Sequence, residues 1–314
     1  MGGIFRWKDK QPLNWYSRSL KRSNQYCLYC GTFVGDGSTG ASDKEHLIGR
    51  EFVPTGEFGD GSLFNFIFRA CQKCNGGKCD LERHVSTVTL YKSPARTKSK
   101  RHDSIACRKA SKDYHPDKKG TLIEDSWESR DVTTHRSGIR MTFGLTAPPQ
   151  EKLDYVRLLA FRHIQGLFSL ITSRDPLSEE GTSLLSGEFF HFGGAYNYGD
   201  WGNPQLVTIA NRSQDIPCWA NISTANGFFQ AIMRRNVGQS GEWFWALEWN
   251  KSLRVVGAIS LPDRTAEILS DLPELAWNET ESEGFVKTRM RPEVPLDEQH
   301  DCLFCGEVNQ TEDV

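Results

Sequence analysis

Apolar residues recur at helical spacing over a long stretch in the middle of the chain. After two prolines at 148 and 149, the residues from about Gln150 to Ser173 carry large apolar side chains three or four positions apart: Leu153, Val156, Leu159, Ala160, Ile164, Leu167, Phe168 and Ile171. This spacing places the side chains on one face of an α-helix, and prolines commonly precede a first helical turn. The pattern predicts one long amphipathic helix.

Shorter apolar runs, rich in β-branched and aromatic residues, lie on both sides of this helix and are typical of strands. Strands are expected over 139–143, 188–192, 206–211 and 218–223, with a hairpin over 242–249 and 253–260. The pattern at 226–235 predicts a second, short helix. Aromatic side chains alternate in two of the strands, which is typical of a buried core, although such a stripe could also line a pocket for a base.

Length and composition indicate a folded intracellular protein. With 314 residues, 38% of them hydrophobic and 11% aromatic, the chain is long enough for two domains and too apolar for a disordered protein. No apolar run approaches 18 residues, and the first residues lack an apolar signal core. Nine cysteines, four of them in the two Cys-x-x-Cys pairs of the first eighty positions, favour reduced thiols and metal binding over disulfides. We therefore expect a cytoplasmic protein without membrane contact.

Two Cys-x-x-Cys pairs lie in the first eighty positions: Cys27, Cys30, Cys71 and Cys74. Each pair can place two thiolates about 2.3 Å from one metal ion, so the pairs together predict a structural Zn²⁺ site. Between and after them stand Glu45, His46, Asn65 and Asn75. Carboxylate, imidazole and amide groups can bind a hard cation and activate water, which a purely structural zinc ribbon does not need.

This arrangement resembles the HNH, or ββα-metal, endonuclease family, in the subtype whose module is braced by four cysteines. The family pattern runs C-x2-C, D/E-H-I-x-P, an Asn, and then C-x2-C-N-x2-K, and its counterparts here span about residues 25–85. The chain departs from the pattern at Glu45, where Asp is commoner, and at Gly49, where Pro is frequent. Neither change removes a chemical function.

The resemblance implies a role for each matching residue. His46 would be the general base that takes a proton from the attacking water, and Asn65 would orient its ring. Glu45 and Asn75 would bind one catalytic Mg²⁺ or Mn²⁺ at the scissile phosphate. The second strand of the module is expected over 64–68, and the helix is expected to open at Cys74 and Asn75. Nucleic-acid contacts are expected from six basic residues: Arg50, Arg69, Lys78, Lys98, Lys100 and Arg101.

Charge is unevenly distributed, although the net charge is only −2. Residues 92–119 carry ten Lys and Arg against three Asp, whereas residues 264–314 carry four basic residues against thirteen acidic ones. A basic stretch directly after a nuclease helix suits phosphate binding, and a flexible solvated linker is the alternative. The acidic tail argues against DNA binding by the C-terminal end.

The expected fold class is α+β, divided into four parts. A zinc-stapled ββα module with an N-terminal arm would span 1–91, and a basic linker or DNA-contacting segment would span 92–137. A separate α+β specificity or regulatory domain, with no recognised family pattern, would span 138–300. A tail over 301–314 holds a third pair, Cys302 and Cys305, which is half of a zinc site. Its partners could be Cys79, Cys107, His102, His115 or a second subunit, and the alternative is a vestigial knuckle.

The sequence thus predicts a metal-dependent HNH endonuclease that hydrolyses DNA. Restriction or anti-phage defence is the expected setting, with a homodimer or a partner defence protein as candidate companions, and a mobile-element or phage nuclease as the competing setting. The alternatives are a non-catalytic, zinc-dependent nucleic-acid-binding or scaffold protein, and an RNA-cleaving toxin.

Overall fold

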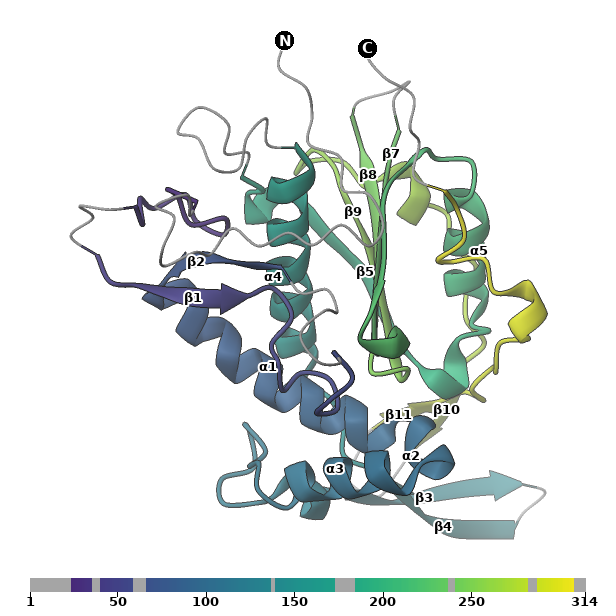
Figure 1. Cartoon of the computed structure of the whole chain (residues 1–314). Coiled ribbons are helices and arrows are strands. Elements are labelled where there is room, and N and C mark those ends of the chain that lie inside the picture. The colour runs from purple at the N-terminus through teal and green to yellow at the C-terminus, as the bar shows by residue number, and fades with distance from the viewer. Residues whose placement is uncertain are drawn as a thin grey trace.

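The computed structural model describes seven stretches of the chain: 24–35, 40–58, 66–136, 139–172, 184–236, 241–281 and 287–307. Helices and strands are mixed throughout, in agreement with the α+β expectation (Figure 1). Of the N-terminal arm expected over 1–24, residues 1–23 lie outside the described residues, and so does Asn65. None of the described helices has both the length and the apolar character that a membrane crossing requires.

The first unit is a β-hairpin followed directly by a helix. Strand β1 (Ser42–His46) pairs antiparallel with β2 (Ile67–Cys71), so that His46 faces Ile67 across the hairpin. Helix α1 (Gln72–Lys92) begins at the next residue, two positions before the expected opening. Of the second strand expected over 64–68, residues 64 and 65 lie outside the described residues, and β2 begins at Ile67. One face of α1 buries Cys74, Leu81 and Val85 within the core.

The basic stretch after α1 is folded into helices and part of a hairpin. Its elements are α2 (Ala95–Lys98), α3 (Lys100–Ala110), a 3₁₀ turn (Ile123–Asp125) and strand β3 (Glu128–Arg136). The Ser99 side chain accepts a hydrogen bond from the backbone N–H of His102 and so caps α3. Because α2 and α3 pack against α1, the flexible-linker alternative for this stretch is wrong.

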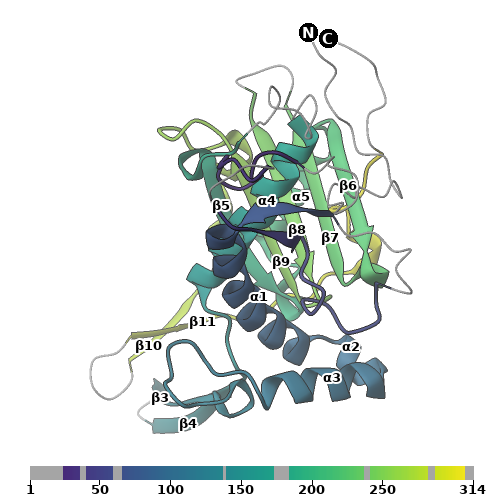
Figure 2. The ribbon, with the colours of Figure 1, turned by 60° about the vertical axis from the view of Figure 1, so that its left-hand side comes forward.

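Strand β4 (Ile139–Ala147) pairs with β3, which confirms the strand expected over 139–143 and extends it by four residues. Helix α4 (Leu153–Thr172) confirms the long amphipathic helix. It buries the apolar face predicted from its spacing, including Val156, Leu159 and Ile164. In Figure 1, α4 stands between α1 and the large sheet, and Figure 2 shows it crossing that sheet.

The large sheet has five antiparallel strands in the order β5-β9-β8-β7-β6. Its members are β5 (Phe190–Asn197), β6 (Cys218–Thr224), β7 (Phe229–Arg235), β8 (Trp243–Trp249) and β9 (Leu253–Ile259). Helix α5 (Pro204–Ser213) covers the face opposite to α4 (Figure 1). Further along the chain, β10 (Asn278–Glu281) pairs with β11 (Lys287–Met290).

Two expected elements of this half were wrong, while 218–223 and the hairpin at 242–260 were confirmed. The expected strand over 206–211 lies in α5, because Asn203 caps that helix and Pro204 fills its first turn. The expected helix over 226–235 is mostly strand β7. Five of the seven residues of β7 are buried, so its apolar run lacks the alternation that marks a half-exposed strand.

One buried cluster joins the first unit to the large sheet. Leu47 and Phe52, which follow β1, belong to the same core as Ile164 of α4 and Trp249 of β8. The Phe52 ring meets the Trp249 indole edge to face, with 5.7 Å between the ring centroids. The division into domains stays a prediction, and any boundary must be reconciled with this shared core.

Candidate functional site

Four cysteines form one cluster: two come from the loop before β1, one from the end of β2 and one from the first turn of α1. The Sγ atoms of Cys27, Cys30, Cys71 and Cys74 all lie within 4.8 Å of one another, and those of Cys30 and Cys71 are 3.6 Å apart. Four thiolates at about 2.3 Å from a zinc ion stand about 3.8 Å from one another at the corners of a tetrahedron. The cluster could therefore hold a metal ion and is compatible with structural zinc, as the sequence predicts.

Local backbone structure brings these thiols together. Gly31 has a φ of 71°, a conformation that glycine adopts without strain, and its N–H bonds to the carbonyl of Cys27 at 2.8 Å. The second pair is placed by the direct passage from β2 into α1. A hydrogen bond from the Cys74 thiol lowers the pKa of Cys27 to about 5, although burial opposes this shift. Metals bind the thiolate form, which this contact already favours.

A row of buried charged groups lies beneath the hairpin. The ammonium Nζ of Lys78 is 2.7 Å from Oε1 of Glu45 and 2.8 Å from Oε1 of Glu82, and it donates to the carbonyl of His46 at 2.9 Å. The Tyr29 hydroxyl donates to the same oxygen of Glu45 at 3.1 Å. All three charged side chains are almost completely buried. The row thus fixes β1 onto α1 by electrostatics.

The pKa shifts in this row follow from burial and charge. Burial raises the pKa of Glu45 and outweighs the attraction of Lys78. At Glu82 burial is overcome by Lys78 and by His163 of α4, and the pKa is lowered to about 2. Burial would lower the pKa of Lys78, but the two carboxylates raise it instead. Lys78 therefore stays charged, and its role as a phosphate contact is wrong because its ammonium is buried in this row.

His46 is the last residue of β1 and directly follows Glu45. Its side chain is partly exposed, and its Nε2 accepts a hydrogen bond from Nε of Arg50 at 3.1 Å. Burial lowers the pKa of His46 to about 4, assisted by the charges of Arg50 and Lys44. The imidazole is consequently neutral near pH 7, and its proton-accepting nitrogen is Nε2, which Arg50 contacts and which water would have to share.

Asn75 lies in the first turn of α1, where its amide Nδ2 is 3.5 Å from Oδ2 of Asp43 and its Oδ1 is 3.8 Å from the Cys79 thiol. Asp43 is two residues before Glu45, so both carboxylates lie on one face of β1. The expected pairing of Glu45 with Asn75 at a divalent ion meets one obstacle. A divalent ion would have to compete with Lys78 for the Glu45 carboxylate.

The expected nucleic-acid contacts divide into two groups. Arg50, Lys98, Lys100 and Arg101 are exposed. Arg69, in contrast, is half-buried, and its guanidinium donates to the carbonyl of Val34 at 3.3 Å. It therefore supports the cysteine knuckle and does not present a free head group.

Helix α3 is tied to the loop that follows His46. Arg101 donates to the carbonyl of Thr55, His102 bonds to Glu57 at 2.9 Å, and Lys109 donates to the carbonyl of Glu51 at 2.6 Å. In Figure 2, α3 lies across the end of α1. The exposed basic residues of α2 and α3 thus belong to the same rigid unit as the loop that carries Arg50.

Sequence reasoning missed Glu82, His163 and Tyr29. Glu82 follows Lys78 by four residues, a spacing that allows a helical ion pair and could have indicated one. His163 lies on α4, with its Nε2 3.6 Å from Oε1 of Glu82, and no local pattern connects residues so distant in sequence.

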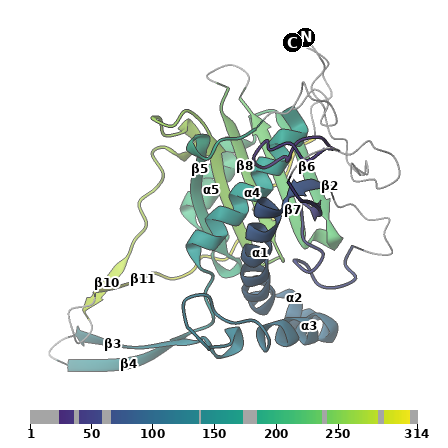
Figure 3. The ribbon, with the colours of Figure 1, turned by 90° about the vertical axis from the view of Figure 1, so that its left-hand side faces the viewer.

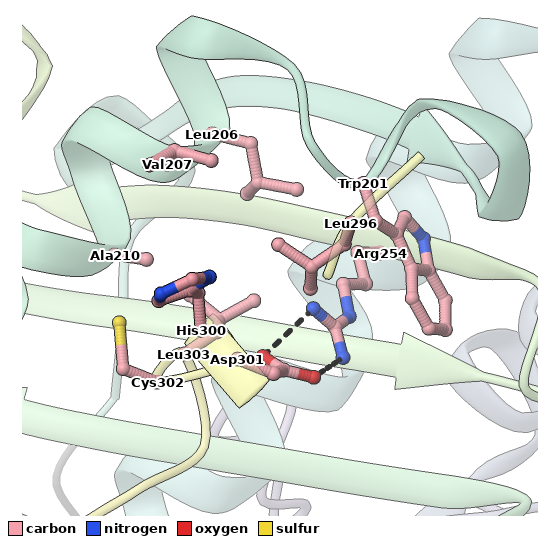
Figure 4. Close-up of a pocket in the computed structure, with 10 residues that line it drawn as sticks. All are labelled: Trp201, Leu206, Val207, Ala210, Arg254, Leu296, His300, Asp301, Cys302 and Leu303. Carbon is pink, nitrogen blue, oxygen red and sulfur yellow. Dashed lines mark hydrogen bonds and ion pairs between the residues drawn. The ribbon is translucent and has the colours of Figure 1, made fainter. Parts of the chain in front are cut away.

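The third Cys-x-x-Cys pair does not build a second cluster. Among the described residues, the four N-terminal cysteines are the one group of three or more metal-binding side chains that come close together. The Cys302 thiol contacts Oδ1 of Asn211, and the Cys305 thiol contacts the carbonyl of Asp301. Figure 4 shows this region as a small hollow in which Asp301 pairs with Arg254 at 3.0 Å. None of the expected partners within the described chain joins Cys302 and Cys305 in a cluster, and a second subunit as partner stays a prediction.

Comparisons with known proteins identify no relative. No protein-family model, no curated protein and no solved structure matches this chain.

Proposed function

We propose that the chain is a metal-dependent HNH endonuclease that hydrolyses phosphodiester bonds in DNA. One observation carries the proposal: a β-hairpin and a helix are closed by a four-cysteine cluster, with His46 at the end of the first strand and Asn75 in the first turn of the helix. This is the order of elements that the resemblance implies. The defence setting stays a prediction.

The proposed chemistry assigns His46 to the attacking water. A neutral imidazole within hydrogen-bond reach of water can take its proton as the nucleophile attacks phosphorus. A bound divalent cation would supply charge stabilisation for the departing 3′-oxygen. Asn75 and Glu45 are the residues that the resemblance gives to this cation, and Asp43 is a second carboxylate beside Asn75.

The proposed substrate contacts are the exposed basic residues on either side of the loop after β1. Arg50, Lys98, Lys100 and Arg101 can bind phosphate oxygens without reading bases. The first turns of α1 are also open, because a Cβ added at Gly76 or Gly77 would meet nothing within 4 Å. These glycines let a nucleic-acid backbone approach this face of the helix closely.

The decisive experiment is nicking of supercoiled plasmid with Mg²⁺ or Mn²⁺. His46→Ala should lower the nicking rate by about 100-fold or more, because a general base is lost. Zinc content and melting temperature should stay as in the wild type, since His46 is outside the cysteine cluster. His300→Ala, which changes an exposed histidine far along the chain, is the matched control. Nicking by His46→Ala at the wild-type rate would exclude the proposal.

A second experiment tests the carboxylate that holds the catalytic cation. Glu45→Gln should raise the Mg²⁺ concentration needed for half-maximal nicking, whereas Glu82→Gln should leave that concentration unchanged. Both variants remove a carboxylate from Lys78, so they share the loss of the buried ion pair and differ in the expected metal contact. If Asp43→Asn alone changes the Mg²⁺ requirement, the ligand is Asp43 and not Glu45.

One observation favours a second candidate, a non-catalytic zinc-dependent nucleic-acid-binding or scaffold protein. The Glu45 carboxylate is already neutralised by Lys78, so the catalytic cation has no uncontested carboxylate at that position. This candidate predicts nucleic-acid binding that is equal in wild type and His46→Ala, with no cleavage by either. Parallel assays on RNA separate the DNA endonuclease from an RNA-cleaving toxin.

A further inference from the structure

Strand β4 is the outer edge of a hairpin that extends from the body of the protein. Within the described chain it pairs with β3 alone, and β10 contacts the hairpin from the side of β3. Nine residue pairs run from Glu128 opposite Ala147 to Arg136 opposite Ile139 without a bulge. Figures 1 and 3 show β4 as the lowest strand of the molecule.

The exposed edge is apolar along one face. Ile139, Met141, Phe143 and Leu145 alternate along β4, and their exposed fractions are 62%, 36%, 50% and 40%. Exposed edge strands are usually protected by lysine, proline or a bulge, because their free N–H and C=O groups pair with other strands. Strand β4 has no lysine, no proline and no bulge. A long, regular and apolar edge of this kind is suited to pairing.

We propose that β4 pairs antiparallel with β4 of a second copy of this chain around a two-fold axis at Phe143. In this register Phe143 faces Phe143, Met141 faces Leu145, and Ile139 faces Ala147. All nine residues of each strand are used, and apolar side chains face apolar side chains throughout. A shift of one residue would place each apolar side chain opposite a polar residue or glycine, which makes the proposed register specific.

Charge on the other face of the hairpin fits the same register. Asp131 of β3 pairs with Gly144 of β4, and a Cβ added at Gly144 would be 3.5 Å from Oδ1 of Asp131. Two-fold pairing places Thr142 of the second copy opposite Gly144 and Arg140 of that copy diagonally beside it. The small glycine leaves room for Arg140 to approach Asp131, and symmetry repeats the contact. In the β4–β4 pairs, Arg140 faces Thr146, so charges of the same sign do not face each other directly.

The pairing also bears on the proposed function, although it does not depend on it. A single module of the proposed kind cuts one strand at a time. A two-fold dimer carries two such modules, and two modules can cut both strands of a duplex in one binding event.

Disulfide trapping tests the register directly. Phe143→Cys should form a covalent dimer under mild oxidation, because residues facing each other across antiparallel strands have Cα atoms within disulfide range. Ile139→Cys should give no more covalent dimer than the wild type, although residue 139 is more exposed than residue 143. Met141→Cys and Leu145→Cys should cross-link when mixed and not when each is alone. Equal trapping at residues 139 and 143 would overturn the proposed register.

Sedimentation analysis tests the dimer itself. Wild type should be a dimer, and Phe143→Asp should raise the dissociation constant at least about tenfold, since two carboxylates then meet at the axis. Leu158→Asp, an equally exposed apolar position on α4, is the matched control and should leave the dimer intact. A wild-type protein that stays monomeric at every concentration would overturn the proposal. If Phe143→Asp then weakened DNA binding, the hairpin would instead be a nucleic-acid contact.

Discussion

The hairpin–helix unit and the five-stranded sheet are built from different chemistry, although they share one core. The first unit has two strands of five residues each, and it buries Glu45, Lys78 and Glu82 beside four clustered thiols. In the sheet, every residue of β8 and β9 is buried, and most of those side chains are apolar. The largest fully buried side chains there are Trp245 and Trp249.

This difference determines how much stability each region loses when one side chain is replaced. Apolar packing loses stability in proportion to the surface and volume removed, and the loss can be shared among many neighbours. A buried charge depends on one or two specific partners, and losing a partner leaves an uncompensated charge. We therefore expect the first unit to fail abruptly when one polar group is removed, and the sheet to weaken gradually.

Metal removal should have the largest effect and should separate the two regions. Structural zinc stabilises small zinc modules by on the order of 10 kcal/mol, because the site does not form without the ion. Chelation, or Cys71→Ser, should therefore expose the amides of β1, β2 and the first turns of α1 to hydrogen exchange. The amides of β8 and β9 should remain protected, since the sheet has a second core beneath α5. Uniform loss of protection in both regions would contradict the comparison.

Replacing the central cation of the buried row should have the next largest effect. Lys78→Met leaves Glu45 and Glu82 facing each other without a counter-charge, and the expected cost is about 3–5 kcal/mol. Adding Glu45→Gln and Glu82→Gln to Lys78→Met should restore much of this stability, because the unpaired charges are removed. Denaturant unfolding of Lys78→Met and of the triple variant, each against wild type, measures both effects. In the sheet, Phe229→Leu should cost less than Lys78→Met.

These two regions also differ in how far the sequence predicts them. In the first unit, the cysteine spacing predicts the cluster, because ligand geometry restricts the spacing of a metal-binding knuckle. Helix α4 and strands β8 and β9 follow from periodicity and turn residues. The sequence predicts a helix at β7 because most of the residues of this strand are buried and its pattern does not alternate. It predicts a strand within α5, although Asn203 and Pro204 are typical of a helix start.

The buried row beneath the hairpin could be predicted only in part. A lysine and a glutamate four residues apart indicate an ion pair, but on most helices such a pair lies in solvent. Its burial depends on α4 packing over α1, which brings His163 to Glu82 across about a quarter of the chain. The sequence therefore predicts Lys78 as a phosphate contact, whereas the tertiary fold makes it a structural counter-ion.

Acid should weaken the first unit through Glu82. Its pKa is about 2 in the folded protein and about 4.3 in an unfolded chain, so its stabilising contribution is complete above roughly pH 4.3 and is lost as the pH falls towards 2. Glu45 acts in the opposite direction, because its folded pKa is raised. Glu82→Gln should flatten the fall of unfolding free energy over this pH window. Burial also lowers the folded pKa of His163, so protonation of this histidine adds to the loss of stability as the pH falls.

The smallest effect is expected at Ser99, the cap of α3. Its hydroxyl accepts from the His102 N–H at 3.4 Å, whereas Asn203 of α5 accepts from Gln205 at 2.9 Å. Cap removal costs about 0.5–2 kcal/mol, and the longer bond places Ser99→Ala at the lower end of that range and Asn203→Ala at the upper end. Denaturant unfolding should confirm this order.

Ser99→Ala also examines whether the basic helix is part of the nucleic-acid surface. Fraying of the first turn of α3 displaces Lys100 and Arg101 without removing their charges. A weaker affinity for DNA with an unchanged salt dependence would therefore mean that the position of these residues matters, since the number of displaced counterions is the same. If hydrogen exchange shows the frayed turn while the affinity for DNA is unchanged, α3 contributes charge but no fixed contact. The connection between α3 and the loop after β1 then stabilises the fold only.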